Sequence, residues 1–397
     1  MRNKRSEVWV WDLCCTVPYY TAELCAALNH EHVDVTLISG SYYLDPSCFG
    51  IAEKLRRPGL LDIAGKARWP MFLRRAIRLA ESLVNLSYWT ARLIISPPTV
   101  IHVQYLSFTR RNLPFEEWFL QLADHLGVRI IYTVHDLLPH DTGLKYKKRY
   151  EDIYRRSDLL ICHSHAIKRQ LEAEYGCGAE SVRVIPHGPL FYGDKGGRIP
   201  LELESLPSEE LVLLCQGLIF PYKGIDFLIR AWTLYKESGG RGMLIIAGTG
   251  AADFLQMIEN QRLRSGVADS IVALFRFLTV DELVGTYARA SAVVYPYRQI
   301  TTSGALLTGL SRGKAIIATD LAPFREIISN GVNGLLVSPD DHLGLAEAIR
   351  LALENRQIRA KLESEVRRLN FGSSVWREVA RETTSTYTAI SGLPHHR

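Results

Sequence analysis

The chain has 397 residues, of which 47% are hydrophobic, 10% aromatic and 22% charged. This length exceeds what one hydrophobic core supports and predicts roughly two or three domains. The hydrophobic content excludes general disorder, because such a chain buries enough apolar surface to offset its conformational entropy.

Targeting signals are not evident in the sequence. No apolar run reaches the roughly 18 residues of a membrane span. The basic start is followed by Glu7 and Asp12 instead of an apolar stretch, so export is not expected. The seven cysteines form no CxxC pair, which is typical of a reducing compartment. We therefore expect a cytoplasmic protein.

Short β-branched or apolar runs alternate with stretches of helical period. Strands are predicted at 7–11, 33–38, 100–104, 128–134, 159–162 and 182–185, and then at 211–216, 243–247, 271–275, 292–295, 315–318 and 334–337. Strand–helix alternation predicts parallel sheets covered on both faces, and two such series predict two sheets. The predicted fold class is α/β, with two Rossmann-like, doubly wound domains facing across a cleft.

The domain boundary is predicted within 193–200, where three glycines and a proline interrupt the pattern. The predicted domains are 1–195 and 196–373, followed by a terminal helix at 374–397. Ligands of open α/β sheets bind beyond the carboxyl ends of the strands. The active site is therefore expected in the cleft between the domains.

A basic segment lies between Lys54 and Arg78, in the half of the chain that holds the whole excess of positive charge. The segment contains a single acidic residue, Asp62. Its basic residues are Lys54, Arg56, Arg57, Lys66, Arg68, Arg74, Arg75 and Arg78. An apolar series at helical spacing runs along its end: Phe72, Ala76, Leu79 and Leu83. This pattern predicts an interfacial helix with its arginines on anionic lipid, at the inner face of the cell membrane. A surface helix facing the core has the same period. Nucleic acid is not expected, because no aromatic stacking pattern accompanies the charge.

His135 and Asp136 follow the strand predicted at 128–134, and His140 and Asp141 come soon after. Polar groups at a strand's carboxyl end point into the cleft, where an imidazole can hydrogen-bond a sugar hydroxyl. A lone histidine is usually structural, but this cluster favours a functional role. Weaker candidates follow later strands: His163, His165 and His187.

Lys223 lies in the turn between a predicted strand and a helix that begins at 225, flanked by Gly217 and Gly224. Glycines let a ligand approach the backbone, and an ammonium group there is a reasonable diphosphate contact. The alternative is a solvated lysine beside a helix cap.

Gly248 follows the next strand in a Gly-Thr-Gly turn that lacks the third glycine of a dinucleotide fingerprint. It predicts a nucleotide-facing turn, or else a plain strand–turn–helix junction.

A stronger candidate runs from the strand at 292–295 into a helix at 305–311. Arg298 could supply a cation here, and Thr302, Ser303 and Gly304 precede the helix. Small polar residues at a helix N-terminus expose unpaired N–H groups and the positive dipole end, which favour a phosphate. The alternative is an ordinary Ser/Thr cap.

Metal motifs are not evident: the sequence has no HExxH, CxxC or D-x-D. We therefore expect no metal cofactor, and charge on a leaving diphosphate would fall to Lys223, Arg298 and helix amides. A serine nucleophile elbow and a Walker A loop are also missing, which argues against hydrolase and P-loop functions.

Four segments together resemble glycosyltransferase family four, whose members are retaining enzymes of the GT-B fold. Residues 217–224 are similar to the family's Lys-Gly segment, and 244–250 to its second strand and turn. Residues 307–319 and 321–334 resemble its donor-site helix, the next strand and the turn that follows. Val134, His135 and Asp136 match the histidine loop of its acceptor domain.

The resemblance implies roles for individual residues. His135 would lie near the donor sugar, Lys223 would bind the diphosphate, and the amides at Ser303 and Gly304 would meet the distal phosphate. The terminal helix would cross back onto the first domain. The family's donors are nucleoside-diphosphate sugars, transfer often needs no metal, and many acceptors are lipid-linked.

The chain departs from the family at the donor site. Ile300 and Thr308 stand where the family commonly has two glutamates, so we identify a variant that lacks this pair and place Thr308 among the nucleotide contacts. Leu218 and Phe220 occupy the region of a common arginine. Thr302-Ser303-Gly304 resembles a Ser-Gly form of the loop.

The expected function is retaining, metal-independent transfer of a sugar from a nucleoside-diphosphate sugar to a glycan or polyprenyl-linked acceptor, in polysaccharide or glycolipid biosynthesis. His135 and Lys223 are the predicted catalytic residues. The alternatives are a nucleotide-sugar epimerase on the same two-domain plan and a non-catalytic binding protein.

Overall fold

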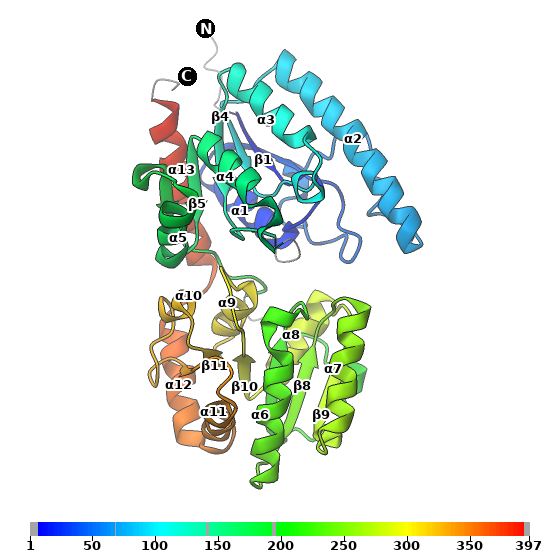
Figure 1. Ribbon diagram of the computed structural model, residues 1–397, viewed down its shortest axis with the longest axis vertical. Coiled ribbons are helices and arrows are strands. Elements are labelled where there is room, and N and C mark those ends of the chain that lie inside the picture. Colours follow the sequence, from blue (N-terminus) through cyan, green and yellow to red (C-terminus); the bar gives the residue numbers. More distant parts are fainter. Residues whose placement is uncertain (1–6, 68, 140–142, 193–195, 393–397) are drawn as a thin grey trace. The chain divides into compact units, whose positions relative to one another are not determined.

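The computed structural model describes residues 7–67, 69–139, 143–192 and 196–392. The chain divides into two compact units (Figure 1). Unit 1 comprises Met1–Gly188 and Val375–Arg397, and unit 2 comprises Pro189–Ser374. The division therefore falls at 188/189 instead of the predicted 195/196, and residues 193–195 lie outside the described part. The C-terminal helix groups with unit 1.

Unit 1 is built on a six-stranded sheet in which every strand pairs in parallel. Its strands are β1 (Glu7–Trp11), β2 (Asp34–Ile38), β3 (Val100–Val103), β4 (Arg129–Thr133), β5 (Leu159–Cys162) and β6 (Val182–Val184), in the order β2-β1-β3-β4-β5-β6. All residues of β3, β4 and β5 are buried. Helices on both faces explain why these strands are continuous apolar runs without polar alternation.

The helices of unit 1 are α1 (Pro18–His30), α2 (Met71–Ile95), α3 (Phe115–His125), α4 (Lys147–Arg156), α5 (His165–Tyr175) and α13 (Ser373–Ser391). Local signals set their ends. The Ser164 hydroxyl accepts a hydrogen bond from the Ile167 amide at the start of α5, and Gly176 ends that helix in the left-handed region. The apolar side of α13 is buried through Trp376, Tyr387 and Ile390.

Unit 2 repeats the plan with a second parallel sheet. Its strands are β7 (Val212–Gln216), β8 (Met243–Ala247), β9 (Ile271–Leu274), β10 (Ala292–Tyr295), β11 (Ala315–Thr319) and β12 (Leu335–Val337), in the order β12-β11-β10-β7-β8-β9. Its helices are α6 (Ile225–Glu237), α7 (Ala252–Arg264), α8 (Val280–Arg289), α9 (Gly304–Ser311), α10 (Ala322–Arg325), α11 (His342–Glu354) and α12 (Arg356–Arg368).

Every predicted strand is present, with each end within one residue of the predicted position. The fold class is therefore confirmed: the chain folds into two doubly wound α/β units. In each sheet the strand order reverses at one point, between β1 and β3 in unit 1 and between β7 and β10 in unit 2. Open sheets bind ligands beyond the carboxyl ends of the strands at such a point. None of the helices in the described residues has the length and apolar character needed to cross a bilayer.

Candidate functional site

The carboxyl end of the unit 2 sheet brings together two loops that are far apart in sequence. The loop after β7 contains Lys223, and the loop after β10 leads to Ser303. These two strands pair with each other at the point where the strand order reverses. Tertiary structure therefore places two of the predicted phosphate-binding elements at the expected edge of the sheet.

Lys223 ends a short 3-10 turn (Pro221–Lys223), and its side chain is only 8% exposed. Its Nζ lies 3.8 Å from the ring centroid of Tyr297 and 5.0 Å from that of Tyr222, both cation–π distances. Gly224 follows at φ +66°, and a Cβ there would lie 2.0 Å from the carbonyl oxygen of Pro296. The solvated-lysine alternative is thus excluded, because the lysine is buried against aromatic rings.

Ser303 is the N-cap of α9, and its hydroxyl accepts a hydrogen bond from the Leu306 amide, which is the Ser/Thr cap given as the alternative above. The same hydroxyl lies 3.4 Å from the Tyr297 hydroxyl, so Tyr297 touches both Lys223 and Ser303. The amides of Gly304 and Ala305, in the first turn, have no helix carbonyl to bond. The first turn of α9 and the lysine ammonium thus share one aromatic neighbour.

Two further tyrosines hold the start of α9 in place. The hydroxyl of Tyr295 donates to the carbonyl of Ala305 at 2.7 Å, and that of Tyr287 lies 3.2 Å from the same carbonyl and 3.1 Å from Oε1 of Gln216. Both side chains are fully buried. The amides of this turn are therefore held in fixed positions, which is what an electrostatic binding site requires.

Gly248 follows β8 at φ +150°, and a Cβ there would lie 1.8 Å from the carbonyl oxygen of Gly217. The loops after β7 and β8 meet backbone to backbone, since the Ile219 amide donates to the Thr249 carbonyl at 2.8 Å. The packing of one loop on the other therefore requires glycine at this position. This requirement agrees with the alternative interpretation of Gly248 as part of a plain strand–turn–helix junction.

Arg298 is engaged away from the helix terminus. Its guanidinium forms ion pairs with Asp226 at 2.7 Å and with Asp340 at 2.8 Å. Burial raises the pKa of Asp226, but the hydrogen bonds and charge of Arg298 outweigh it and leave that pKa below its usual value. The prediction that Arg298 supplies a phosphate-binding cation does not fit this arrangement, because two carboxylates already neutralise it. Arg298 instead ties the start of α6 to the loop before α11.

The remaining predicted donor contacts occupy the loop before α9 and the helix itself. Thr302 is half-buried in the loop, beside Ser303. Thr308 is 2% exposed, and its hydroxyl donates to the Gly304 carbonyl within the helix. Ile300 packs against the apolar core of unit 2. The two positions that lack glutamates thus carry an apolar side chain and a hydroxyl that is bonded inside its own helix.

The carboxyl end of the unit 1 sheet holds a cluster of imidazoles around Tyr20. His135, His163 and His187 follow β4, β5 and β6, and their rings lie within 5.4 Å of the Tyr20 ring. The His135 and His163 centroids are 5.3 Å apart. The Nε2 of His135 lies 3.0 Å from Oε1 of Gln104. His140 and Asp141, predicted near this site, lie outside the described residues.

These histidines are held in the neutral form. Burial lowers the pKa of His163 to about 4 and that of His187 to about 3. Burial also lowers the pKa of His135 well below its ordinary value, and the neighbouring imidazoles lower it further. A neutral imidazole both donates and accepts a hydrogen bond, which suits contact with a sugar hydroxyl. Sequence reasoning singled out His135 but missed Tyr20 and Gln104, which follow other strands.

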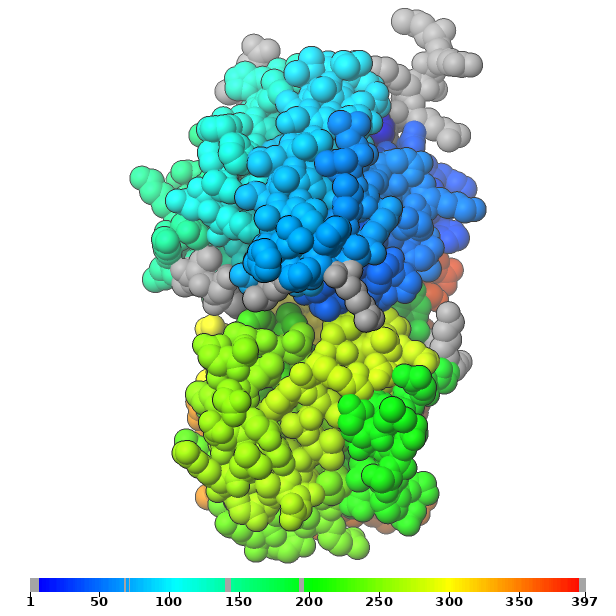
Figure 2. All heavy atoms as spheres, turned by 90° about the vertical axis from the view of Figure 1, so that its right-hand side faces the viewer, coloured from blue at the N-terminus to red at the C-terminus, as the bar shows by residue number. Residues whose placement is uncertain are grey.

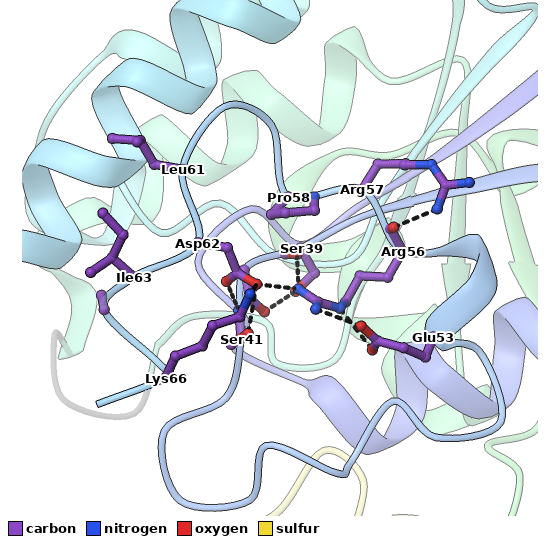
Figure 3. Close-up of polar contacts among 12 residues, drawn as sticks. Ser39, Ser41, Glu53, Arg56, Arg57, Pro58, Leu61, Asp62, Ile63 and Lys66 are labelled. Carbon is purple, nitrogen blue, oxygen red and sulfur yellow. Dashed lines mark hydrogen bonds and ion pairs between the residues drawn. The ribbon is translucent and has the colours of Figure 1, made fainter. Parts of the chain in front are cut away.

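Several charged side chains of the basic segment contact one another or nearby residues of unit 1 (Figure 3). Asp62 accepts hydrogen bonds from the Ser41 amide and hydroxyl, both at 2.8 Å, and pairs with Arg56 and Lys66 at 3.1 Å. Burial alone would raise the pKa of Asp62, but these contacts lower it. Arg56 also pairs with Glu53 at 2.7 Å. Part of the predicted lipid-binding charge is therefore neutralised within the protein.

The arginines of α2 differ in availability. Arg78 donates to the carbonyls of Cys14 and Ser41, and the Arg74 guanidinium lies 3.7 Å from the Tyr43 ring centroid. Arg75 is exposed. Arg78 is half-buried and bonds two backbone carbonyls of its own unit, which does not fit the predicted contact with lipid. Arg68 lies outside the described residues.

The outer face of α2 is mostly apolar, while its inner face carries both apolar core residues and buried polar side chains. Glu81 accepts from the Ala64 amide at 2.8 Å, and Asn85 donates to the Leu61 carbonyl at 2.7 Å. The exposed residues recur at helical spacing and include Phe72, Ala76, Leu79, Leu83, Val84, Ile94 and Ile95. The light-blue spheres of this helix face the viewer in Figure 2. The helix also faces the core through Leu86, Trp89 and Leu93, so the predicted apolar series is an exposed face of a helix that packs on the unit by its other side.

Among the described residues, three or more His, Cys, Asp or Glu side chains are nowhere grouped so as to hold a metal ion.

Two family models match the chain. The model described as Glycosyltransferase Family 4 matches residues 17–188, and the model described as Glycosyl transferases group 1 matches residues 210–355. Together they cover more than half of the chain. The chain belongs to glycosyltransferase family four. The first family match ends where the first segment of unit 1 ends, and the second lies within unit 2.

Curated relatives of this family-four chain are distant. A D-inositol 3-phosphate glycosyltransferase of Acidothermus cellulolyticus is 27% identical over 213 residues, which are 51% of this chain and 47% of the relative. A glycogen synthase of Mycobacterium tuberculosis is 24% identical over 237 residues, or 60% and 55% of the two chains. The family-four chain thus spans about half the length of these relatives.

Solved structures match the family-four chain over nearly its whole length. A glycosyltransferase from Rickettsia africae has a TM-score of 0.71 and 18% identity, covering 99% of this chain and 100% of its own. Anabaena HepE in complex with UDP-glucose has a TM-score of 0.71 and 17% identity, covering 96% and 99%. At this identity the likeness shows the fold, which is GT-B.

Proposed function

We propose that the protein is a retaining glycosyltransferase that moves a sugar from a nucleoside-diphosphate sugar to a glycan or polyprenyl-linked acceptor, in polysaccharide or glycolipid biosynthesis. The observation that carries this proposal is the pairing of the buried Lys223 ammonium with the N-terminus of α9, through Tyr297. Both groups favour negative charge at the edge where open sheets bind ligands.

The proposed chemistry depends on charge that develops on the departing diphosphate. Lys223 and the first-turn amides of α9 would stabilise that charge, with the amides held by the tyrosines that bond Ala305. Because these groups supply positive charge from the protein itself, we propose that transfer needs no metal. For His135 we propose a hydrogen bond to a sugar hydroxyl, the role that the family resemblance assigns.

The donor is the first property to test. Because Anabaena HepE was solved with UDP-glucose, UDP and UDP-glucose head a thermal-shift screen that also includes GDP and ADP. A ligand at 100 times its dissociation constant adds about 2.7 kcal/mol to the free energy of unfolding. Stabilisation by one nucleoside diphosphate supports the proposal. A flat response to all of them would overturn the donor site and favour a non-catalytic binding protein.

Transfer is then measured with the donor that stabilises the protein. Anomeric ¹H NMR of the product distinguishes retention from inversion, and the same reaction with EDTA tests metal independence. Incubation with donor alone separates a transferase from an epimerase, because only an epimerase converts the sugar nucleotide without an acceptor. Complete loss of transfer in EDTA, restored by Mg²⁺, would contradict the metal-free chemistry.

We further propose that unit 1 attaches to the inner face of the cell membrane through the outer face of α2. Support comes from its exposed apolar series, in which Phe72 is 76% and Ile95 is 76% exposed. Soluble proteins rarely leave such a face uncovered, and exposed basic residues nearby, including Arg75, suit anionic lipid.

Cosedimentation with vesicles of equal parts phosphatidylglycerol and phosphatidylcholine tests the attachment. Leu79→Glu with Leu83→Glu should abolish pelleting, because the double variant places two carboxylates on the apolar face. Leu343→Glu, on α11, is the matched control, since Leu343 is 73% exposed on a helix of unit 2. Equal pelleting of the double variant and the control would refute attachment through α2.

A further inference from the structure

A chain of buried hydrogen bonds runs from His135 to the C-terminal helix. Oε1 of Gln104 faces His135. The amide nitrogen of the same glutamine, Nε2, donates to the hydroxyl of Thr133 at 3.4 Å. That hydroxyl lies 2.7 Å from Nε2 of His102, whose Nδ1 lies 2.6 Å from the hydroxyl of Tyr387 on α13. The bond between His102 and Tyr387 joins residues 285 positions apart in sequence.

The members of this chain are shielded from water. Gln104 and Thr133 are 0% exposed, His102 is 1% and Tyr387 is 5% exposed. Burial lowers the pKa of His102 to about 3, so its ring is neutral and carries one donor and one acceptor. A buried polar group that loses its partner costs about 1–3 kcal/mol, so every member is held in place by its neighbours.

The orientation of Gln104 decides which nitrogen of His135 carries the proton. With its amide nitrogen bonded to Thr133, Gln104 presents an oxygen to His135, and an amide oxygen can only accept. This arrangement favours protonation of the neutral His135 ring at Nε2, with Nδ1 as the basic nitrogen. If the Gln104 amide turned over, the opposite tautomer would be favoured.

We propose that Tyr387 is a positioning residue, which acts through His102, Thr133 and Gln104 to fix the orientation and tautomer of His135. Without the phenolic hydroxyl, the buried Nδ1 of His102 has no partner. Reorientation of the His102 ring then becomes favourable. The ring loses its hydrogen bond to Thr133, and Thr133 no longer holds the Gln104 amide in one orientation. The catalytic consequence rests on the proposed function, since it requires that His135 contacts the sugar, but the effect on the tautomer does not.

The α13 helix contacts the same cluster at a second place. Trp376 packs against Tyr20, with ring centroids 5.3 Å apart, and against His187. A Cβ on Gly188 would lie 2.3 Å from the Trp376 ring, so this contact is close. The helix thus reaches the imidazole cluster by an aromatic contact at its start and by the hydroxyl of Tyr387 near its end.

The experiment compares the intact protein with Tyr387→Phe, which keeps the ring and removes only the hydroxyl, and with Thr133→Val, which breaks the chain in its middle. Thr384→Val is the matched control, because that hydroxyl bonds only to the Ala380 carbonyl of its own helix. Selective ¹⁵N labelling of histidine allows long-range ¹H–¹⁵N spectra to report the tautomer of His135, assigned with a His135→Gln variant.

We expect a protonated Nε2 in the intact protein and in the control, and a mixture of tautomers in both test variants. We also expect kcat to fall about 10-fold in Tyr387→Phe with the donor KM nearly unchanged, the size typical of groups that orient a functional side chain. Unchanged ¹⁵N shifts in both variants would overturn the proposal. Absence of transfer by the unaltered protein would instead count against the proposed function, so the two failures are distinguishable.

Discussion

The carboxyl ends of the two sheets differ in electrostatic character, since one is neutral and the other is positively charged. In unit 1, burial keeps the imidazoles of His135, His163 and His187 neutral. In unit 2, a buried ammonium lies beside a helix N-terminus, and both favour an anion. One doubly wound plan therefore supports two kinds of site. The first suits hydrogen bonds to uncharged hydroxyls, and the second suits a phosphate.

The largest expected effect tests the charged edge. Lys223→Met removes the ammonium and keeps the aliphatic stem that packs on Tyr297. We expect transfer to fall about 100- to 1,000-fold, because one electrostatic donor to the leaving group is lost. Steady-state rates with the stabilising donor give the measurement, and Lys361→Met, an exposed lysine of α12, is the control. Near-normal transfer by Lys223→Met would show that the unit 2 edge does not act through the lysine charge. The contrast between a charged edge and a neutral edge would then have no functional meaning.

The loop packing at the same edge predicts the next effect. Gly248→Ala forces a Cβ against the Gly217 carbonyl at a φ that L-residues rarely adopt. We expect the free energy of unfolding of unit 2 to fall by about 3 kcal/mol. Urea unfolding followed by hydrogen exchange of unit 2 peptides measures it. Gly372→Ala, with nothing within 4 Å of the added Cβ, should change little. An equal effect of both variants would contradict the packing argument.

The neutral edge predicts a dependence on pH. The folded protein protonates His187 only near pH 3, whereas the unfolded chain does so near 6.5. Between these values the unfolded state binds more protons, so unit 1 loses stability as the pH falls. At pH 5 this histidine contributes about 2 kcal/mol to that loss. His187→Phe should therefore reduce the difference in unfolding free energy of unit 1 between pH 7 and pH 5. An unchanged difference would show that His187 is not neutral in the folded unit.

The smallest expected effect concerns Arg298. Arg298→Gln removes ion pairs to Asp226 and Asp340 from a side chain that is 34% exposed. We expect a loss of at most about 1 kcal/mol in the stability of unit 2 and a nearly unchanged affinity for the nucleotide. Calorimetric titration with the nucleoside diphosphate is the measurement. A tenfold weaker affinity would show that Arg298 contributes to phosphate binding. The positive charge of the site would then come from both Lys223 and Arg298.

Sequence reasoning was most reliable where local structure decides the outcome. The strands were located because continuous β-branched runs are bounded by turns, and Ser303 was placed at a helix start by its small polar neighbours. Lys223 was found because it lies in a strand-to-helix turn. The role of Tyr297 between them was missed, since it depends on how two separate loops pack.

Tertiary partners explain the remaining differences. The period of α2 predicts an amphipathic helix but does not say which side faces inward. Here Glu81 and Asn85 bind the loop before the helix, and Leu86, Trp89 and Leu93 pack in the core, which leaves the predicted apolar series exposed. No local pattern links Tyr387 with His102, because the two residues lie 285 positions apart in the sequence.

The return of the chain from unit 2 to unit 1 has a consequence for biosynthesis. Unit 2 is continuous in sequence, whereas unit 1 takes its last helix from the residues synthesised after unit 2. A nascent polypeptide that has completed β6 therefore still lacks Trp376 and Tyr387, and the surfaces they cover stay open to solvent until α13 has been synthesised. The first unit to begin folding is therefore completed only after the whole of the second unit has been synthesised.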